Sequence, residues 1–299
     1  MISSIARAFR ARPAVKTIAT RALFEHHAPP RILAPRFFST TNPQSFQPTV
    51  PAEITRDVAE SIQDTTLFYL RHGISNQRLL SLSNDTESPL VHKWQRMMEI
   101  YLSTQVFVIS GLGYPGDERG LETYTRHLAE FMQHKCDDEE RDSYKKVGQE
   151  TWQELLATAF DLDTDNIQTL SIVDARNIMH KVSSKMQEPD VLMKIQKECA
   201  KLPHNPDIEL ELTQKHMVLQ TIIVNDVYMG GSPSLVESCG FGSGEKGYAY
   251  LQCVMAEFES DPLIAQYAGA AMARIWEAAG LDMNSIQNAG NIRVPGGTP

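Results

Sequence analysis

Three aspartates stand at alternate positions directly after Phe160, in the segment FDLDTD. Asp161, Asp163 and Asp165 offer many carboxylate oxygens within a short stretch of chain, and a fourth carboxylate, Asp174, follows a little later. Calcium takes six to eight oxygen ligands and favours carboxylates that converge from closely spaced residues. The spacing therefore predicts a metal site on a loop between two helices, with calcium as the ion.

The segment resembles the loop of the EF-hand family, which supplies ligands from its first, third and fifth positions. Asn166 stands at the place of the family's turn glycine, and asparagine tolerates left-handed backbone better than most residues. In strict register the twelfth residue is Ile172, which cannot ligate. A two-residue insertion instead makes Leu170 the apolar loop residue and Asp174 the terminal ligand.

EF-hands normally occur in pairs, and residues 197–223 are the predicted second hand, with a helix, a loop, a short strand and a second helix. Leu212 lies 42 residues after Leu170 and is followed by Thr213, as Leu170 is followed by a serine. The second loop has acidic residues but no series of ligands, so it is expected to hold no metal. The resemblance covers roughly residues 150–228.

The aspartates also suit a second interpretation, in which an acidic, solvated turn ends one helix and caps the next. Asp174 is one carbon shorter than the glutamate that usually closes such a loop, which makes chelation through both oxygens difficult. Calcium would then bind weakly or not at all. The sequence leaves both interpretations open.

The triplet Arg71-His72-Gly73 resembles the one that histidine phosphatases place at the end of a strand. The residues before it have the pattern of a helix, and no Thr/Ser-x-x-Asn continuation follows. His72 is therefore expected at a helix end beside a glycine cap. No catalytic residue is assigned.

A glycine-rich segment, GFGSGEKG, contains Gly242, Gly244 and Gly247 in the pattern G-x-G-x-x-G. A dinucleotide site requires a strand directly before this pattern, and none is expected there. Lys246 is followed by glycine and not by Ser or Thr, which argues against a nucleotide P-loop. The segment is expected to be a flexible loop, and no cofactor-binding residue is assigned.

The first 38 residues carry seven Lys or Arg against one acid, and they are rich in Ser and Ala. Basic residues interrupt every apolar run, which excludes the core of a secretory signal. This composition predicts a mitochondrial transit peptide cleaved near Phe38. A Pro-rich linker over 39–52 and a disordered tail over 291–299 are predicted to flank one helical domain, 53–290.

The whole chain has 299 residues and a formal net charge of −9. The predicted transit peptide carries a net charge of +6, so the remainder of the chain would stand near −15. An acidic body argues against nucleic acid or anionic lipid as a partner. The four cysteines lack metal or paired spacing and no apolar run is long enough for a membrane span, so a soluble matrix protein is expected.

From residue 53 onward apolar residues recur at helical spacing, and alternation of period two is nearly absent. The pattern predicts helices over 53–73, 88–110, 121–134, 143–160, 174–186, 190–202, 213–229, 248–259 and 262–280. The predicted fold class is all-α, a helical bundle that includes the EF-hand-like pair. Trp94, Trp152 and Trp276 are expected to anchor its core.

Three classes of function are compatible with these features. The favoured one is a protein that acts through protein–protein contacts, as an assembly factor, an accessory subunit or a regulator. The alternatives are a calcium-responsive regulator that uses the four aspartates, and an enzyme of unrecognised type.

Overall fold

The computed structural model describes residues 50, 51, 53–164, 169–204 and 208–281. The predicted transit peptide, most of the predicted linker and the predicted tail lie outside these residues. Over the described part of the chain the structure contains eleven α-helices and no β-strand, which confirms the predicted all-α class.

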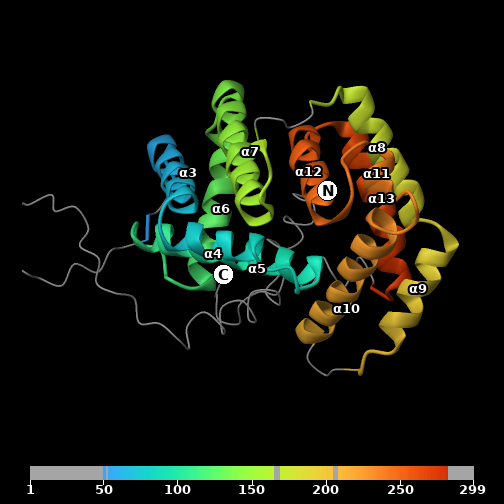
Figure 1. The fold of residues 1–299 in the computed structure, drawn as a ribbon. Coiled ribbons are helices and arrows are strands. Elements are labelled where there is room, and N and C mark those ends of the chain that lie inside the picture. The colour runs from blue at the N-terminus through green and yellow to red at the C-terminus, as the bar shows by residue number, and fades with distance from the viewer. Residues whose placement is uncertain (1–49, 52, 165–168, 205–207, 282–299) are drawn as a thin grey trace, which may run out of the picture.

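The first five helices are α3 (Arg56–Arg71), α4 (Ile74–Ser83), α5 (Leu90–Ser110), α6 (Glu118–His134) and α7 (Asp138–Phe160). The remaining elements are α8 (Ile172–Met186), α9 (Pro189–Ala200), α10 (Ile208–Ile222), the π-helix η2 (Ile223–Tyr228), α11 (Leu235–Ser238), α12 (Gly244–Met255), the 3₁₀ turn η3 (Ala256–Phe258) and α13 (Pro262–Ala278). Figure 1 shows α3 to α7 in one half of the molecule and α8 to α13 in the other.

Helix α7 begins earlier than the predicted 143–160, because its acidic first turn is helical. The Asp137 side chain accepts a hydrogen bond from the backbone N–H of Glu140, and the Glu140 side chain accepts one from the N–H of Asp137. This reciprocal cap satisfies two of the N–H groups that a helix start leaves without partners. Three acids in the first turn also interact favourably with the helix dipole.

Helix α4 is an element that the sequence analysis did not assign. It starts directly after Gly73, whose φ of 106° reverses the chain at the end of α3. Leu79 and Leu82 of α4 are fully buried, so this short helix is held by tertiary packing more than by its own propensity.

Two groups of buried side chains form the core. The smaller one joins α3, α6 and the C-terminal end of α5, and includes Ile62, Ile109 and Phe131. The larger one joins the N-terminal part of α5, the C-terminal part of α7 and the helices of the second half. Helix α5 thus contributes to both groups and connects the two halves of the molecule (Figure 1).

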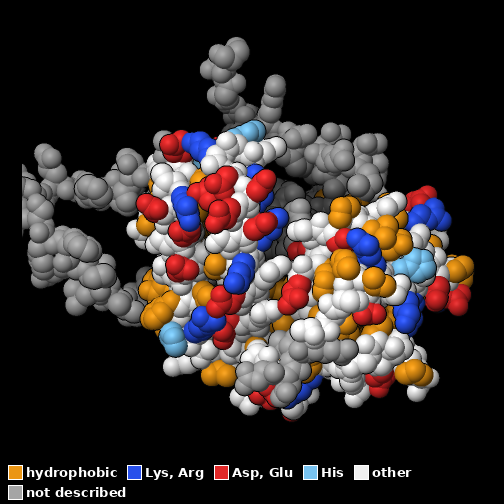
Figure 2. Space-filling view, turned by 90° about the horizontal axis from the view of Figure 1, so that it is seen from above, with side chains coloured by type: hydrophobic (Ala, Val, Ile, Leu, Met, Phe, Trp, Pro, Cys, Tyr) orange, Lys and Arg blue, Asp and Glu red, His pale blue; other side chains and the backbone are white. Residues whose placement is uncertain are grey.

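None of the described helices is long and apolar enough to cross a membrane. Figure 2 shows acidic and basic side chains interspersed over the half that α3 to α7 form, while hydrophobic side chains are more frequent on the visible face of the other half.

Candidate functional site

The first aspartate of the predicted metal loop, Asp161, ends helix α7. Its φ of 51° and ψ of 56° are left-handed, a conformation that glycine usually supplies at this place. The backbone N–H groups of Asp161 and Leu162 both donate to the carbonyl oxygen of Ala157, and the Leu162 side chain is buried just beyond the helix end. This closure directs the Asp161 side chain into solvent.

The Asp161 carboxylate meets a partner from the glycine-rich segment. Lys246 Nζ donates to Asp161 Oδ2 at 2.7 Å, across 85 residues of sequence. Both side chains are largely exposed, so water and salt weaken this ion pair. Two motifs that the sequence shows separately therefore meet in the structure.

Asp163 contacts α12, the helix that also carries Lys246, through its main chain. Its N–H donates to the Tyr250 hydroxyl oxygen at 2.6 Å, and that hydroxyl donates to the carbonyl oxygen of Asp163 at 3.1 Å. One α12 tyrosine thus satisfies both backbone groups of a loop residue, which fixes the path of the loop without using the Asp163 carboxylate.

Asp174 lies in the first turn of α8, where it is part of a helix cap. Its N–H donates to Ser171 Oγ at 3.1 Å, and Ser171 Oγ lies 2.6 Å from Asp174 Oδ2. Ser171 is thus the N-cap residue of α8 and Asp174 supports that cap, while the role of Asp174 as a metal ligand stays a prediction. Asp165 lies outside the described residues, as does Asn166.

Among the residues that the structure describes, no three His, Cys, Asp or Glu side chains are grouped as metal ligands. Lys246, Ser171 and Tyr250 contact three of the four predicted ligand residues, and Lys246 occupies one of the two carboxylate oxygens of Asp161. The calcium site stays a prediction, because one of its four residues is outside the described set.

The short strand predicted for the second hand is wrong. Leu212 and Thr213 lie inside α10, which begins at Ile208. The EF-hand resemblance predicted the strand, but Leu, Glu, Gln and Lys are good helix formers and α10 packs against the core. Within the described part of the chain the isolated β-bridge joins Gly231 to Ser234, in neither of the two predicted loops. The pair as a whole remains a prediction.

The backbone conformation of the glycine-rich segment requires its glycines. Gly242 and Gly244 have φ values of 78° and 71°, which residues with a side chain rarely adopt. A Cβ on Gly247 would lie 2.4 Å from the carbonyl oxygen of Gly242, so only glycine fits there. The element before the segment is the short helix α11, where a dinucleotide-binding unit has a strand.

A second ion pair ties the start of α12 to α5. Lys93 Nζ lies 2.5 Å from Glu245 Oε2, and only 6 % of the Lys93 side chain is exposed. A buried ammonium group requires a charged partner, because transfer out of water is otherwise costly. The glycine-rich segment is thus fixed by Lys93 on one side and by Asp161 on the other.

Aromatic side chains fill the space beside this ion pair. The Trp94 ring lies 5.6 Å from that of Trp152, 5.9 Å from that of Phe160 and 5.5 Å from that of Tyr248. Tyr248 in turn lies 5.2 Å from Tyr228 of the π-helix. The tryptophans predicted to anchor the core pack against it, Trp276 included. Burial raises the pKa of both Tyr228 and Tyr248 well above the usual value of a tyrosine.

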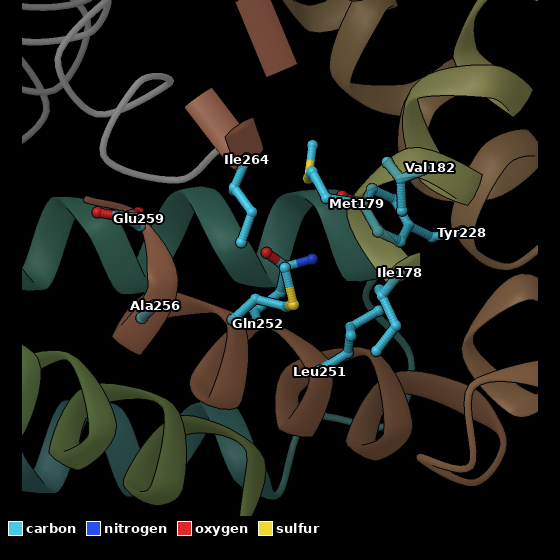
Figure 3. A pocket seen from close by; sticks show the side chains of 10 residues that line it. Ile178, Met179, Val182, Tyr228, Leu251, Gln252, Ala256, Glu259 and Ile264 are labelled. Carbon is cyan, nitrogen blue, oxygen red and sulfur yellow. The ribbon is translucent and has the colours of Figure 1, made fainter. Parts of the chain in front are cut away.

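A small cavity lies beside Tyr228, between α8, α12 and α13. It is lined mainly by apolar side chains such as Ile178, Met179 and Ile264, with the Gln252 amide among them (Figure 3). Its volume of about 20 Å³ is enough for one water molecule and too small for a substrate or a cofactor.

Arg71 and His72 lie at the end of α3, as predicted. His72 is the C-cap residue, its N–H donates to the carbonyl oxygen of Phe68, and Gly73 follows with a positive φ of 106°. The Arg71 guanidinium pairs with Glu154 and Glu150 of α7, each at 2.8 Å. The triplet therefore stabilises a helix end and the contact between α3 and α7.

The residues that sequence reasoning missed form a group of aromatic side chains, which we call the aromatic surface. It consists of the exposed Phe68 of α3, His72 at the C-cap of α3 and Phe107 of α5, with the half-buried Tyr69 between the two phenylalanines. The Phe68 ring lies 5.7 Å from Tyr69 and 5.1 Å from His72, and Tyr69 lies 5.3 Å from Phe107. Phe68 is 57 % exposed and Phe107 is 52 % exposed. Ile74, the first residue of α4, is exposed as well. The next residue, Ser75, connects α4 to α5, because its hydroxyl lies 2.7 Å from the hydroxyl of Thr104.

Comparison of the chain with protein-family models, with curated proteins and with solved structures finds no match. The candidate sites therefore rest on the chain's own residues.

Proposed function

We propose that this chain acts in the mitochondrial matrix by binding another protein, as an assembly factor, an accessory subunit or a regulator. The observation that carries the proposal is the aromatic surface. Large aromatic rings are enriched at protein interfaces and often anchor them, because they bury much area at a small cost in conformational entropy.

The arrangement of these rings supports an interface more strongly than the exposure of single hydrophobic residues would. Single exposed hydrophobic residues are ordinary on protein surfaces, whereas contiguous apolar patches mark interaction sites. Phe68 and Phe107 come from different helices, and Tyr69 joins them edge to face. Each phenylalanine nevertheless keeps more than half of its area exposed, which a partner would bury.

The test is affinity isolation of the tagged full chain from mitochondria, with quantification of each co-purified protein. Phe68→Ser combined with Phe107→Ser should release a stoichiometric partner and leave the melting temperature within a few degrees of the wild type. The matched control is Val173→Ser with Met193→Ser, since these side chains are 59 % and 58 % exposed and lie on α8 and α9.

Loss of the same partner from both double variants would mean that general surface hydrophobicity holds it. Retention of every stoichiometric partner by the Phe68→Ser, Phe107→Ser variant would refute the aromatic surface as the interface.

A further inference from the structure

Two carboxylates continue the aromatic surface along α3. Asp57 and Asp64 precede Phe68 by eleven and four residues, spacings that place all three on one face of the helix. Asp57 lies about 16 Å from Phe68 along the helix axis, at 1.5 Å per residue. Both aspartates are exposed.

The cations near these aspartates already have other partners. Arg56 pairs with Glu60 at 2.8 Å and with Glu140 at 3.1 Å. Arg71 pairs with two glutamates of α7. No ion pair is found for Asp57 or Asp64 within the described part of the chain, so this strip of α3 presents uncompensated negative charge next to exposed aromatic rings.

Such a surface suits a ligand that is apolar at one end and basic along the rest of its length. A helix that lies along α3 could cover Phe68 and Phe107 with apolar side chains. Lys or Arg one turn and three turns further along would then reach Asp64 and Asp57. Binding of an amphipathic helix through anchors at helical spacing is a common mode of peptide recognition.

A second copy of this chain fits the surface less well. It would bring the same uncompensated carboxylates and a net charge of −9 to an interface that is already acidic. Like charges that face each other across an interface disfavour binding, whereas opposite charges increase both specificity and the rate of association.

We propose that the partner presents a basic amphipathic helix to the aromatic surface and to Asp57 and Asp64. This inference rests on the proposed function and specifies the chemistry of the partner.

The test uses the full chain and two defined probes, an 18-residue amphipathic peptide of Leu and Lys and its counterpart with Glu in place of Lys. The Lys peptide should bind and the Glu peptide should not. Phe68→Ser with Phe107→Ser should weaken binding of the Lys peptide about tenfold or more, as removal of interface anchors does. Asp57→Asn with Asp64→Asn should weaken it about fivefold at low salt, the effect of two exposed ion pairs.

The matched control is Glu198→Gln with Glu277→Gln, which changes the net charge equally but lies on α9 and α13. This variant should bind the Lys peptide within about twofold of the wild type, since screening limits distant charges. An equal loss in the control and in the Asp57, Asp64 variant would show attraction to the whole acidic body and would overturn the inference.

The remaining outcomes separate this inference from the proposed function. If the aspartate variant binds the Lys peptide as the wild type does, the partner is not basic, and the affinity isolation still decides whether the aromatic surface is an interface. If sedimentation shows a wild-type dimer that Phe68→Ser with Phe107→Ser dissociates, the occupant is a second copy and the inference is wrong. If the aromatic variant keeps full affinity for the Lys peptide, the inference fails whatever the isolation shows.

Discussion

Gly247 offers a quantitative test of why the glycine-rich segment has its composition. A Cβ at this position would lie 2.4 Å from the carbonyl oxygen of Gly242 and 2.8 Å from that of Phe241. Both oxygens belong to the backbone, so the segment itself would have to move. Forced overpacking of this kind costs about 1–3 kcal/mol, and a backbone clash belongs at the upper end, so we expect Gly247→Ala to destabilise the fold by about 3 kcal/mol.

The same substitution in open helical positions should have the opposite sign. Gly148 of α7 and Gly269 of α13 are exposed, and a Cβ at either would meet no atom within 4 Å. Replacement by alanine there removes the excess backbone freedom of glycine in the unfolded chain. We expect a gain of about 0.5–1 kcal/mol at each position.

Thermal unfolding followed by circular dichroism measures all three variants. For a folded body of this size about 1 kcal/mol corresponds to 2–4 °C, so Gly247→Ala should melt roughly 6–12 °C lower and the two controls a few degrees higher. An unchanged melting temperature for Gly247→Ala would refute the argument that only glycine fits. Saturable binding of ATP or NAD, lost in Gly242→Ala with Gly244→Ala, would assign the segment to a nucleotide instead.

Three further predictions concern calcium, pH and import. If calcium binds with a dissociation constant of about 10⁻⁴ M, 1 mM calcium should stabilise the fold by about 1.4 kcal/mol. Asp161→Ala should abolish this gain, whereas Ile172→Glu should not strengthen calcium binding. An unchanged melting temperature in calcium would show that the loop is a purely structural turn. The raised pKa values of Tyr228 and Tyr248 keep both side chains neutral in the folded state, so their contribution to the free energy of unfolding is complete below pH 10. It is lost as the tyrosines of the unfolded chain ionise above pH 10, about 3 kcal/mol for the pair at pH 11. Urea unfolding at pH 8 and pH 11 should show about half of this loss in Tyr228→Phe, and a loss equal to that of the wild type would refute the assignment. Imported protein should begin near Ser39 and be about 4 kDa smaller than its precursor, at roughly 110 Da per residue, and an N-terminal sequence that starts at Met1 would exclude cleavage.

The sequence by itself determined the all-α class and most helix positions, because helical periodicity is a local property of the chain. Helices α5 and α13 lie where the apolar spacing predicts them, and the end of α3 at His72 follows from the glycine after it. The errors are local as well: residues placed before the predicted helix 143–160 form the first turn of α7, and the short strand expected from the EF-hand resemblance lies within α10. Capping and helix propensity outweighed the simpler pattern at both places.

Only the tertiary structure decided which distant residues meet. Lys246 reaches Asp161 across 85 residues, and Lys93 reaches Glu245 across 152. No local pattern encodes these contacts, because they depend on how α5, α7 and α12 pack. The aromatic surface has the same origin: Phe68 and Phe107 have the apolar character of core residues in the sequence, and only the packing of α3 against α5 leaves both exposed with Tyr69 in contact with each.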